Sequence, residues 1–191
     1  MQWSRRWSRS VLPWAATLAV CSTLAFGQSA LDLDGRATNP LSAGPAKVTV
    51  LVFLRTDCPV SSRYAPAIRK IANRYAVSAR FWLVYPDKSE TSQSIHKYLA
   101  DYGYNLPALR DPEHVLVKQG RVQITPEVAV FDSRGHLVYD GRIDDWYVTL
   151  GQSRSAPTTH ELEDAIHAAA TGKTAAKSEV RGVGCYISDL E

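Results

Sequence analysis

The chain has 191 residues, 45% of them apolar and 21% charged, which suits one domain with a buried core and excludes a disordered protein. The net charge of +3 comes from 22 basic and 19 acidic residues, and three arginines but no acid lie in residues 1–27. The remaining chain is therefore balanced at 19 against 19, which argues against a nucleic-acid partner.

Residues 1–27 have the organisation of a secretory signal peptide. Arg5, Arg6 and Arg9 precede an apolar run over 11–26, and Ala25-Phe26-Gly27 offers small residues for cleavage. The run is shorter than a bilayer span. We expect a protein exported to the periplasm or secreted, which meets the membrane only through this signal. An uncleaved anchor is one alternative.

A lipid anchor at Cys21 is a second alternative to simple cleavage. The sequence Leu18-Ala19-Val20-Cys21 resembles a lipoprotein cleavage box, although Val20 is bulky for that position. After the leader, we expect a flexible lead-in over 28–46, a folded domain over 47–171 and a polar C-terminal tail over 172–191 that carries Cys185.

The first half of the domain alternates strands and helices. The continuous apolar run 47–54 predicts a strand buried on both faces, and 59–75 has the apolar spacing of a helix. A second buried strand is predicted over 79–85, followed by a helix over 90–102 that Gly103 can cap.

The second half ends in a hairpin and a helix. We predict a strand over 106–109, a helix over 112–118, strands over 127–131 and 136–139, and a helix over 158–170 that Thr159 caps. Strands separated by helices pair in parallel, and the hairpin adds antiparallel strands. The order therefore predicts an α/β fold with a mixed central β-sheet flanked by helices.

Cys58 lies directly after the first predicted strand and directly before a helix. Pro59 suits the first helical turn, where its missing N–H costs nothing. The thiol is thereby placed near free backbone N–H groups and the positive end of the helix dipole, which favour the nucleophilic thiolate. A buried, inert cysteine at a strand end is the alternative.

The segment from Thr56 to Ser61 resembles the active-site turn of the thioredoxin family. In that family a Cys-x-x-Cys pair opens a helix, and a proline follows eight residues after the first cysteine, as Pro66 follows Cys58. Ser61 replaces the second cysteine, so a dithiol cannot form within this turn. The resemblance implies a thioredoxin-like fold.

Thr125-Pro126 is the second match to this family. It precedes the strand over 127–131 and is similar to the cis-proline loop that lies beside the active cysteine and pairs with an extended substrate. An ordinary trans proline at the start of a strand is the alternative. The resemblance assigns substrate binding to these two residues.

Three motifs resemble the peroxiredoxin-like branch, which is related to alkyl hydroperoxide reductase and thiol-specific antioxidant proteins. They are Asp57-Cys58-Pro59, the run 141–145 and Gly184-Cys185-x-Ile187, and the resemblance covers about residues 46–188. It implies antioxidant or thiol-redox chemistry.

True peroxiredoxins differ from this chain before the cysteine. They carry a proline seven residues and a threonine three residues upstream, where this chain has Leu51 and Arg55. Thr56 could still bind a peroxide oxygen, and Arg55 or Arg142 could stabilise the thiolate. A surface ion pair of Arg142 with a neighbouring aspartate is the alternative.

Cys185 has three interpretations. It could resolve an oxidised Cys58 by forming a disulfide, it could form a permanent structural disulfide, or it could stay unpaired. The favoured function is an exported thiol peroxidase or thiol–disulfide oxidoreductase with Cys58 as nucleophile, Ser61 and Thr125 shaping the site, and an external thiol or a protein disulfide as partner. No metal and no cofactor is expected.

Two other functions remain open at the level of the sequence. Copper-handling thioredoxin-fold proteins carry Cys-x-x-x-Cys, whereas Ser62 stands at the fourth position after Cys58. The other open function, besides copper handling, is that of a non-catalytic, partner-binding domain with Cys58 and Cys185 in a structural disulfide.

Overall fold

The computed structural model describes residues 1, 29–42, 46–173, 181–188 and 190. Apart from Met1, the expected signal peptide lies outside the described residues, and so does Cys21. Among the described residues, no helix is long and apolar enough to cross a membrane.

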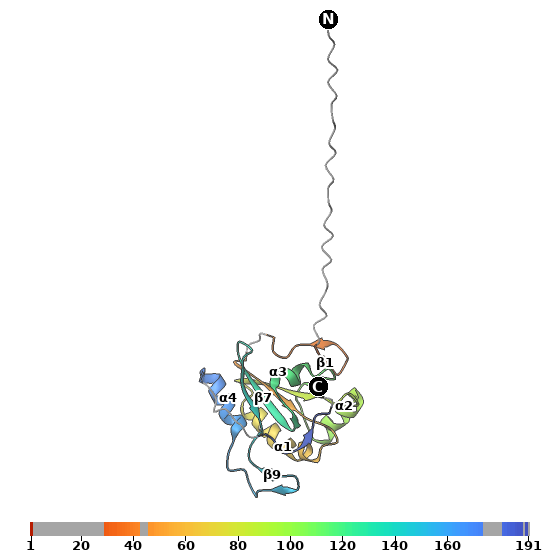
Figure 1. The fold of residues 1–191 in the computed structure, drawn as a ribbon. Helices are drawn as coiled ribbons and strands as arrows, with labels where there is room; N and C mark the ends of the chain where they lie inside the picture. The colour runs from red at the N-terminus through yellow and green to blue at the C-terminus, as the bar shows by residue number, and fades with distance from the viewer. Residues whose placement is uncertain (2–28, 43–45, 174–180, 189, 191) are drawn as a thin grey trace.

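A seven-stranded mixed sheet forms the centre of the molecule (Figure 1). Its strands, in spatial order, are β2 (Ala37–Thr38), β1 (Ala30–Asp32), β5 (Ala108–Arg110), β4 (Ala79–Tyr85), β3 (Val48–Phe53), β7 (Glu127–Asp132) and β8 (Leu137–Gly141). Two pairs lie apart from it: β6 (Ile124–Thr125) with β11 (Cys185–Tyr186), and β9 (Tyr147–Thr149) with β10 (Gln152–Ser153).

The pairing follows from the order of elements. The strands β3, β4 and β5 are parallel, because a helix or crossover connects each to the next, whereas β7 and β8 form an antiparallel hairpin against β3. Every residue of β3 is buried, as expected for a strand covered on both faces. The predicted α/β fold with a mixed central sheet is confirmed.

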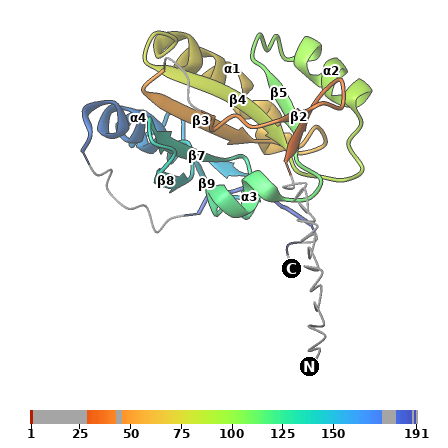
Figure 2. The same ribbon diagram turned by 90° about the horizontal axis from the view of Figure 1, so that it is seen from above.

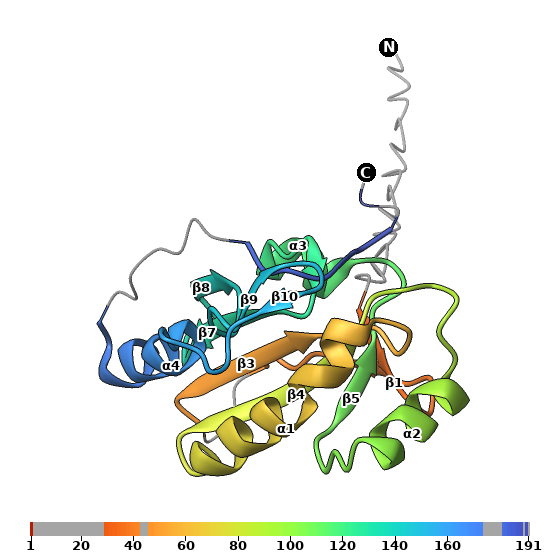
Figure 3. The same ribbon diagram turned by 90° about the horizontal axis from the view of Figure 1, so that it is seen from below.

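Helices cover both faces of the sheet (Figure 3). They are α1 (Pro59–Arg74), α2 (Ser92–Asp101), α3 (Val115–Gly120) and α4 (Glu161–Thr171). Apolar residues of α1, α2 and α4 share one core cluster with one face of β3 and β4, whereas α3 packs in a second cluster on the opposite face. The N-terminus of α1 follows the end of the central strand β3 after a short loop that contains Cys58.

The lead-in is more ordered than the sequence suggests. β1 and β2 extend the sheet beyond β5, as Figure 2 shows at the edge opposite β8. The lead-in around them is rich in glycine and polar residues and has no strand period, so only the pairing of β1 with β5 and of β2 with β1 reveals these strands. Likewise, two residues of the polar tail form β11.

Two helix starts differ from the prediction. His160, and not Thr159, is the N-cap residue of α4 and makes no side-chain capping bond, while the carboxylate of Asp145 accepts the amides of Thr158 and Thr159 just before the helix. α3 was expected over 112–118 and runs over Val115–Gly120, since the side chain of Asp111 accepts three amides of its first turn. At both starts a carboxylate that precedes the helix accepts backbone amides.

Candidate active site

Cys58 is the N-cap residue of α1 and is 1% exposed. Burial raises the pKa of the Cys58 thiol, but the hydrogen bond from the Cys185 thiol and the bonds from Ser61 and Val60 outweigh burial, so the pKa of Cys58 lies below its ordinary value. The donors are backbone N–H groups of the first helical turn and the Ser61 hydroxyl. This environment favours the thiolate of Cys58.

Ser61 stands where the second cysteine of a Cys-x-x-Cys turn would stand. Its side chain is fully buried and its hydroxyl accepts a weak hydrogen bond from the Arg55 amide at 3.5 Å. Ser61 therefore contacts the loop before Cys58 and stabilises negative charge on the Cys58 sulfur.

The loop at Pro126 lies beside the cysteine. The Thr125–Pro126 peptide bond is cis, as the resemblance implies. The carbonyl oxygen of Thr125 lies 3.3 Å from the Cys58 Sγ, within reach of a hydrogen bond from the protonated thiol. The structure thus brings together Cys58, Ser61, Thr125 and Pro126.

The structure places Cys185 directly over Cys58. The two Sγ atoms are 2.7 Å apart, although the residues are 127 positions apart in the chain, and both are free thiols. Burial, the hydrogen bond to Cys58 and its negative charge raise the pKa of Cys185 to about 12. Of the two thiols Cys58 is therefore the stronger acid, and Cys185 is the donor in the hydrogen bond between them.

The strand β11 holds Cys185 there. β11 pairs antiparallel with β6, with Cys185 opposite Thr125, and the Thr125 hydroxyl donates to the Cys185 carbonyl at 3.2 Å. The ladder continues at Ile187, whose amide donates to the Gln123 carbonyl and whose side chain is buried in the second core cluster. Figure 1 shows this dark blue segment beside the start of α1.

Two glycines let the tail lie against the cis-proline loop. A Cβ on Gly184 would stand 2.0 Å from the Thr125 carbonyl oxygen, and one on Gly182 would stand 2.8 Å from the Pro126 carbonyl oxygen. Neither position has room for a side chain without moving backbone atoms. The tail can therefore follow this path along the cis-proline loop only because residues 182 and 184 are glycines.

Glu127 joins the loop to the tail, and the sequence analysis missed this role. Its fully buried carboxylate accepts the amides of Gln123 and Ile124 through Oε2 and the Gly182 amide through Oε1 at 2.7 Å. Arg181 lies 3.8 Å away and supplies opposite charge. An acid at the start of a strand whose next four residues are apolar was the signal that could have revealed it.

Arg55, and not Arg142, lies at the cysteine site. Arg55 pairs with Asp57 at 2.8 Å and Asp87 at 3.2 Å, and its Nη1 donates to the carbonyl of Tyr186 at 3.4 Å. Its positive charge lowers the pKa of Cys185, against the larger effect of burial. Arg55 was one of the two arginines that the sequence analysis considered for stabilising the thiolate.

Arg142 has a different environment from the one expected. Its guanidinium forms an ion pair with Glu161 at the start of α4 and donates to the Thr159 hydroxyl. Its neighbours in the run 141–145 also support the fold, since Asp144 accepts the Tyr64 hydroxyl at 2.6 Å. The ion pair with Glu161 holds the charge of Arg142 at the start of α4, and stabilisation of the thiolate by Arg142 stays a prediction.

Thr56 lies in the loop before Cys58. Its amide donates to the Glu90 Oε1 at 2.6 Å, and Glu90 is buried, which raises the pKa of that carboxyl. The contact shows how Thr56 is held in the loop, and contact with a peroxide stays a prediction.

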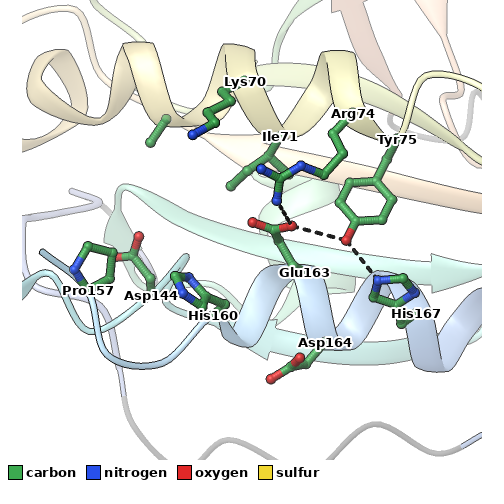
Figure 4. A pocket seen from close by; sticks show the side chains of 11 residues that line it. Lys70, Ile71, Arg74, Tyr75, Asp144, Pro157, His160, Glu163, Asp164 and His167 are labelled. Atoms are coloured by element: carbon green, nitrogen blue, oxygen red, sulfur yellow. Dashed lines mark hydrogen bonds and ion pairs between the residues drawn. The ribbon is translucent and has the colours of Figure 1, made fainter.

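A groove of about 420 Å³ between α1 and α4 is separate from the cysteines (Figure 4). Glu163 lies at its centre, bonded to Arg74 and to the Tyr75 hydroxyl, which also contacts His167. In the part of the chain that the structure describes, no group of three or more histidine, cysteine or acidic side chains is arranged to hold a metal ion.

Comparisons with known proteins agree with this architecture. A family model described as thioredoxin-like matches residues 44–137, which include Cys58 and the cis-proline loop. The fold is thioredoxin-like. No curated relative matches the sequence.

Solved structures with this thioredoxin-like fold cover most of the chain. An uncharacterised conserved protein from Geobacillus kaustophilus has a TM-score of 0.69 at 21% identity over 83% of this chain and 86% of its own. A hypothetical protein from Sinorhizobium meliloti has a TM-score of 0.69 at 22% identity over 83% and 88%. A secreted Mycobacterium tuberculosis disulfide oxidoreductase homologous to E. coli DsbE has a TM-score of 0.51 at 19% identity over 73% and 94%.

Proposed function

We propose that this protein is an exported thiol–disulfide oxidoreductase in which Cys58 is the nucleophile and Cys185 resolves the intermediate. The observation that carries the proposal is the 2.7 Å approach of the two Sγ atoms at the N-terminus of α1 beside the cis-proline loop. The opposite pKa shifts of the two thiols support the assignment of roles.

The exchange proceeds in two balanced steps. The Cys58 thiolate attacks one sulfur of a substrate disulfide, a Cys58–substrate disulfide forms, and the other substrate sulfur leaves as a thiolate. The charge on Cys58 is then gone, and with it one cause of the raised pKa of Cys185. Cys185 loses its proton to solvent and attacks the Cys58 Sγ, which releases the second substrate thiolate.

The product is a reduced substrate and a Cys58–Cys185 disulfide. An external thiol reductant returns both cysteines to the thiol state by the same exchange chemistry. The secreted oxidoreductase with this fold supports export and action on disulfides, as the leader also does. No metal and no cofactor takes part in these steps.

A peroxidase is the second candidate. The Cys58 thiolate is 1% exposed beneath the tail, and a small peroxide needs less opening there than a protein disulfide does. Cys58 would attack the peroxide oxygen, forming a sulfenic acid and water or an alcohol, and Cys185 would condense with it to the disulfide and a second water. Thr56 and Ser61 supply the hydroxyl groups in this peroxidase mechanism.

A redox titration against glutathione tests the proposal. We expect Cys58 and Cys185 to form one disulfide with a midpoint potential above about −300 mV, the range of disulfides that exchange. Peptide mapping after a single equivalent of peroxide decides between the two oxidants. Cys58→Ala and Cys185→Ala are the controls. A potential below that range would show a structural disulfide in a non-catalytic domain, and tight copper binding by the reduced protein would favour the copper-handling alternative.

A further inference from the structure

The tail pairs with the edge of β6. The backbone of β6 pairs with β11 in antiparallel fashion, and Cys185 stands opposite Thr125, so the residue of the tail that faces the cis-proline loop is a cysteine. An extended segment of another polypeptide would use the same N–H and C=O groups of β6. The backbone groups of β6 can pair with only one strand at a time. The tail and such a segment therefore cannot bind β6 together.

The contacts of the tail show which side chains this edge accepts. Immediately before the cysteine, a Cβ would stand 2.0 Å from the Thr125 carbonyl oxygen and 3.1 Å from Pro126, so only glycine fits. Two positions after it, Ile187 is 5% exposed and packs in the second core cluster. Between them, Tyr186 is 74% exposed, so this position places no restriction on the side chain.

We propose that the substrate of Cys58 is an extended polypeptide segment that displaces the tail and carries glycine immediately before its cysteine and an aliphatic residue two positions after it. This inference rests on the proposed oxidoreductase function. The tail is then an intramolecular copy of the substrate. It leaves the β6 edge for the substrate to enter and returns to bring Cys185 to Cys58.

The full-length chain allows a direct test. Cys185→Ser keeps the tail docked, whereas Gly184→Val with Cys185→Ser places a side chain against the Thr125 carbonyl and removes the tail from β6. Ile187→Ser with Cys185→Ser removes the tail through a different contact and serves if the first variant does not fold, as judged by circular dichroism.

The probe is a peptide of residues 181–188 whose cysteine is joined to thionitrobenzoate. The Cys58 thiolate attacks the peptide sulfur, a Cys58–peptide disulfide forms, and thionitrobenzoate leaves as a coloured thiolate. We expect the variant without a docked tail to react about tenfold faster than Cys185→Ser, because the tail reduces the fraction of protein with a free edge. A peptide with valine before its cysteine should show no such gain.

Glutathione joined to thionitrobenzoate separates recognition from simple exposure. A gain for the peptide that exceeds the gain for this small probe supports the proposal. Equal gains for the glycine peptide, the valine peptide and the small probe would overturn it, and so would equal peptide rates with and without a docked tail. If Cys58 fails to react with the small probe in every folded variant, the proposed function itself fails.

Discussion

At the scale of single residues, the environment of Cys58 combines opposing effects on its thiol. Burial favours the neutral form, while the first-turn amides, the Ser61 hydroxyl and the Cys185 thiol favour the thiolate. The donors prevail because α1 begins at this residue and leaves its first N–H groups unpaired. A cysteine placed elsewhere on α1 would meet no such donors.

We expect the thiolate of reduced Cys58 to form at a pH below the ordinary range of about 8.5. Since the hydrogen bond from Cys185 lowers this pKa, Cys185→Ala should move the transition to higher pH. Thiolate absorbance near 240 nm, recorded across pH, measures it. Cys58→Ala is the control that removes the transition. An unshifted midpoint in Cys185→Ala would contradict the role of that hydrogen bond.

At the scale of elements, the position of β11 depends on one side chain of β7. Glu127 accepts amides from the loop before Pro126 and from Gly182, so it fixes the separation of β6 and the tail. A two-residue strand has too few ladder bonds to hold itself in place. The carboxylate, the two glycines of the tail and the buried Ile187 supply the rest.

Glu127→Gln should make the Cys58–Cys185 disulfide easier to reduce by about tenfold, because losing a hydrogen bond to a charged group costs roughly 1.5–3 kcal/mol. Equilibration with glutathione measures this. The matched control is Asp132→Asn, since Asp132 accepts the amides of Arg134 and His136 in a hairpin turn far along the chain from the tail. Equal changes in how easily the disulfide is reduced in the two variants would show that Glu127 contributes only to general stability.

At the scale of the whole molecule, the sheet brings Cys58 and the start of β7 to the same end of its central strands. β3 delivers Cys58 at one end of the central strands, and β7, its antiparallel neighbour, begins at that same end with Glu127 opposite Phe53. The cis-proline loop and the tail are thereby carried to the N-terminus of α1. Local sequence could not show this meeting, because the two cysteines are 127 residues apart.

Joining residues so far apart should stabilise the oxidised protein by about 5 kcal/mol over the reduced one, from the loss of chain entropy in the unfolded state. Urea unfolding of the oxidised and reduced protein, followed by circular dichroism, measures the difference. Cys58→Ala should unfold at the same urea concentration with and without reductant. Equal stability of the oxidised and reduced wild type would mean that the disulfide strains the fold.

The elements that carry a hydrophobic period could be predicted from the sequence, from the strand at 48–53 through α1 and β4 to the hairpin of β7 and β8. The sequence also indicated Cys58 at a helix start, which depends on neighbours within a few residues, and the family resemblance implied the cis-proline loop. Tertiary structure alone decided what depends on distant partners. The lead-in strands, the docking of Cys185, the role of Glu127 and the pairing of Arg142 with Glu161 all arise from contacts that no local pattern encodes.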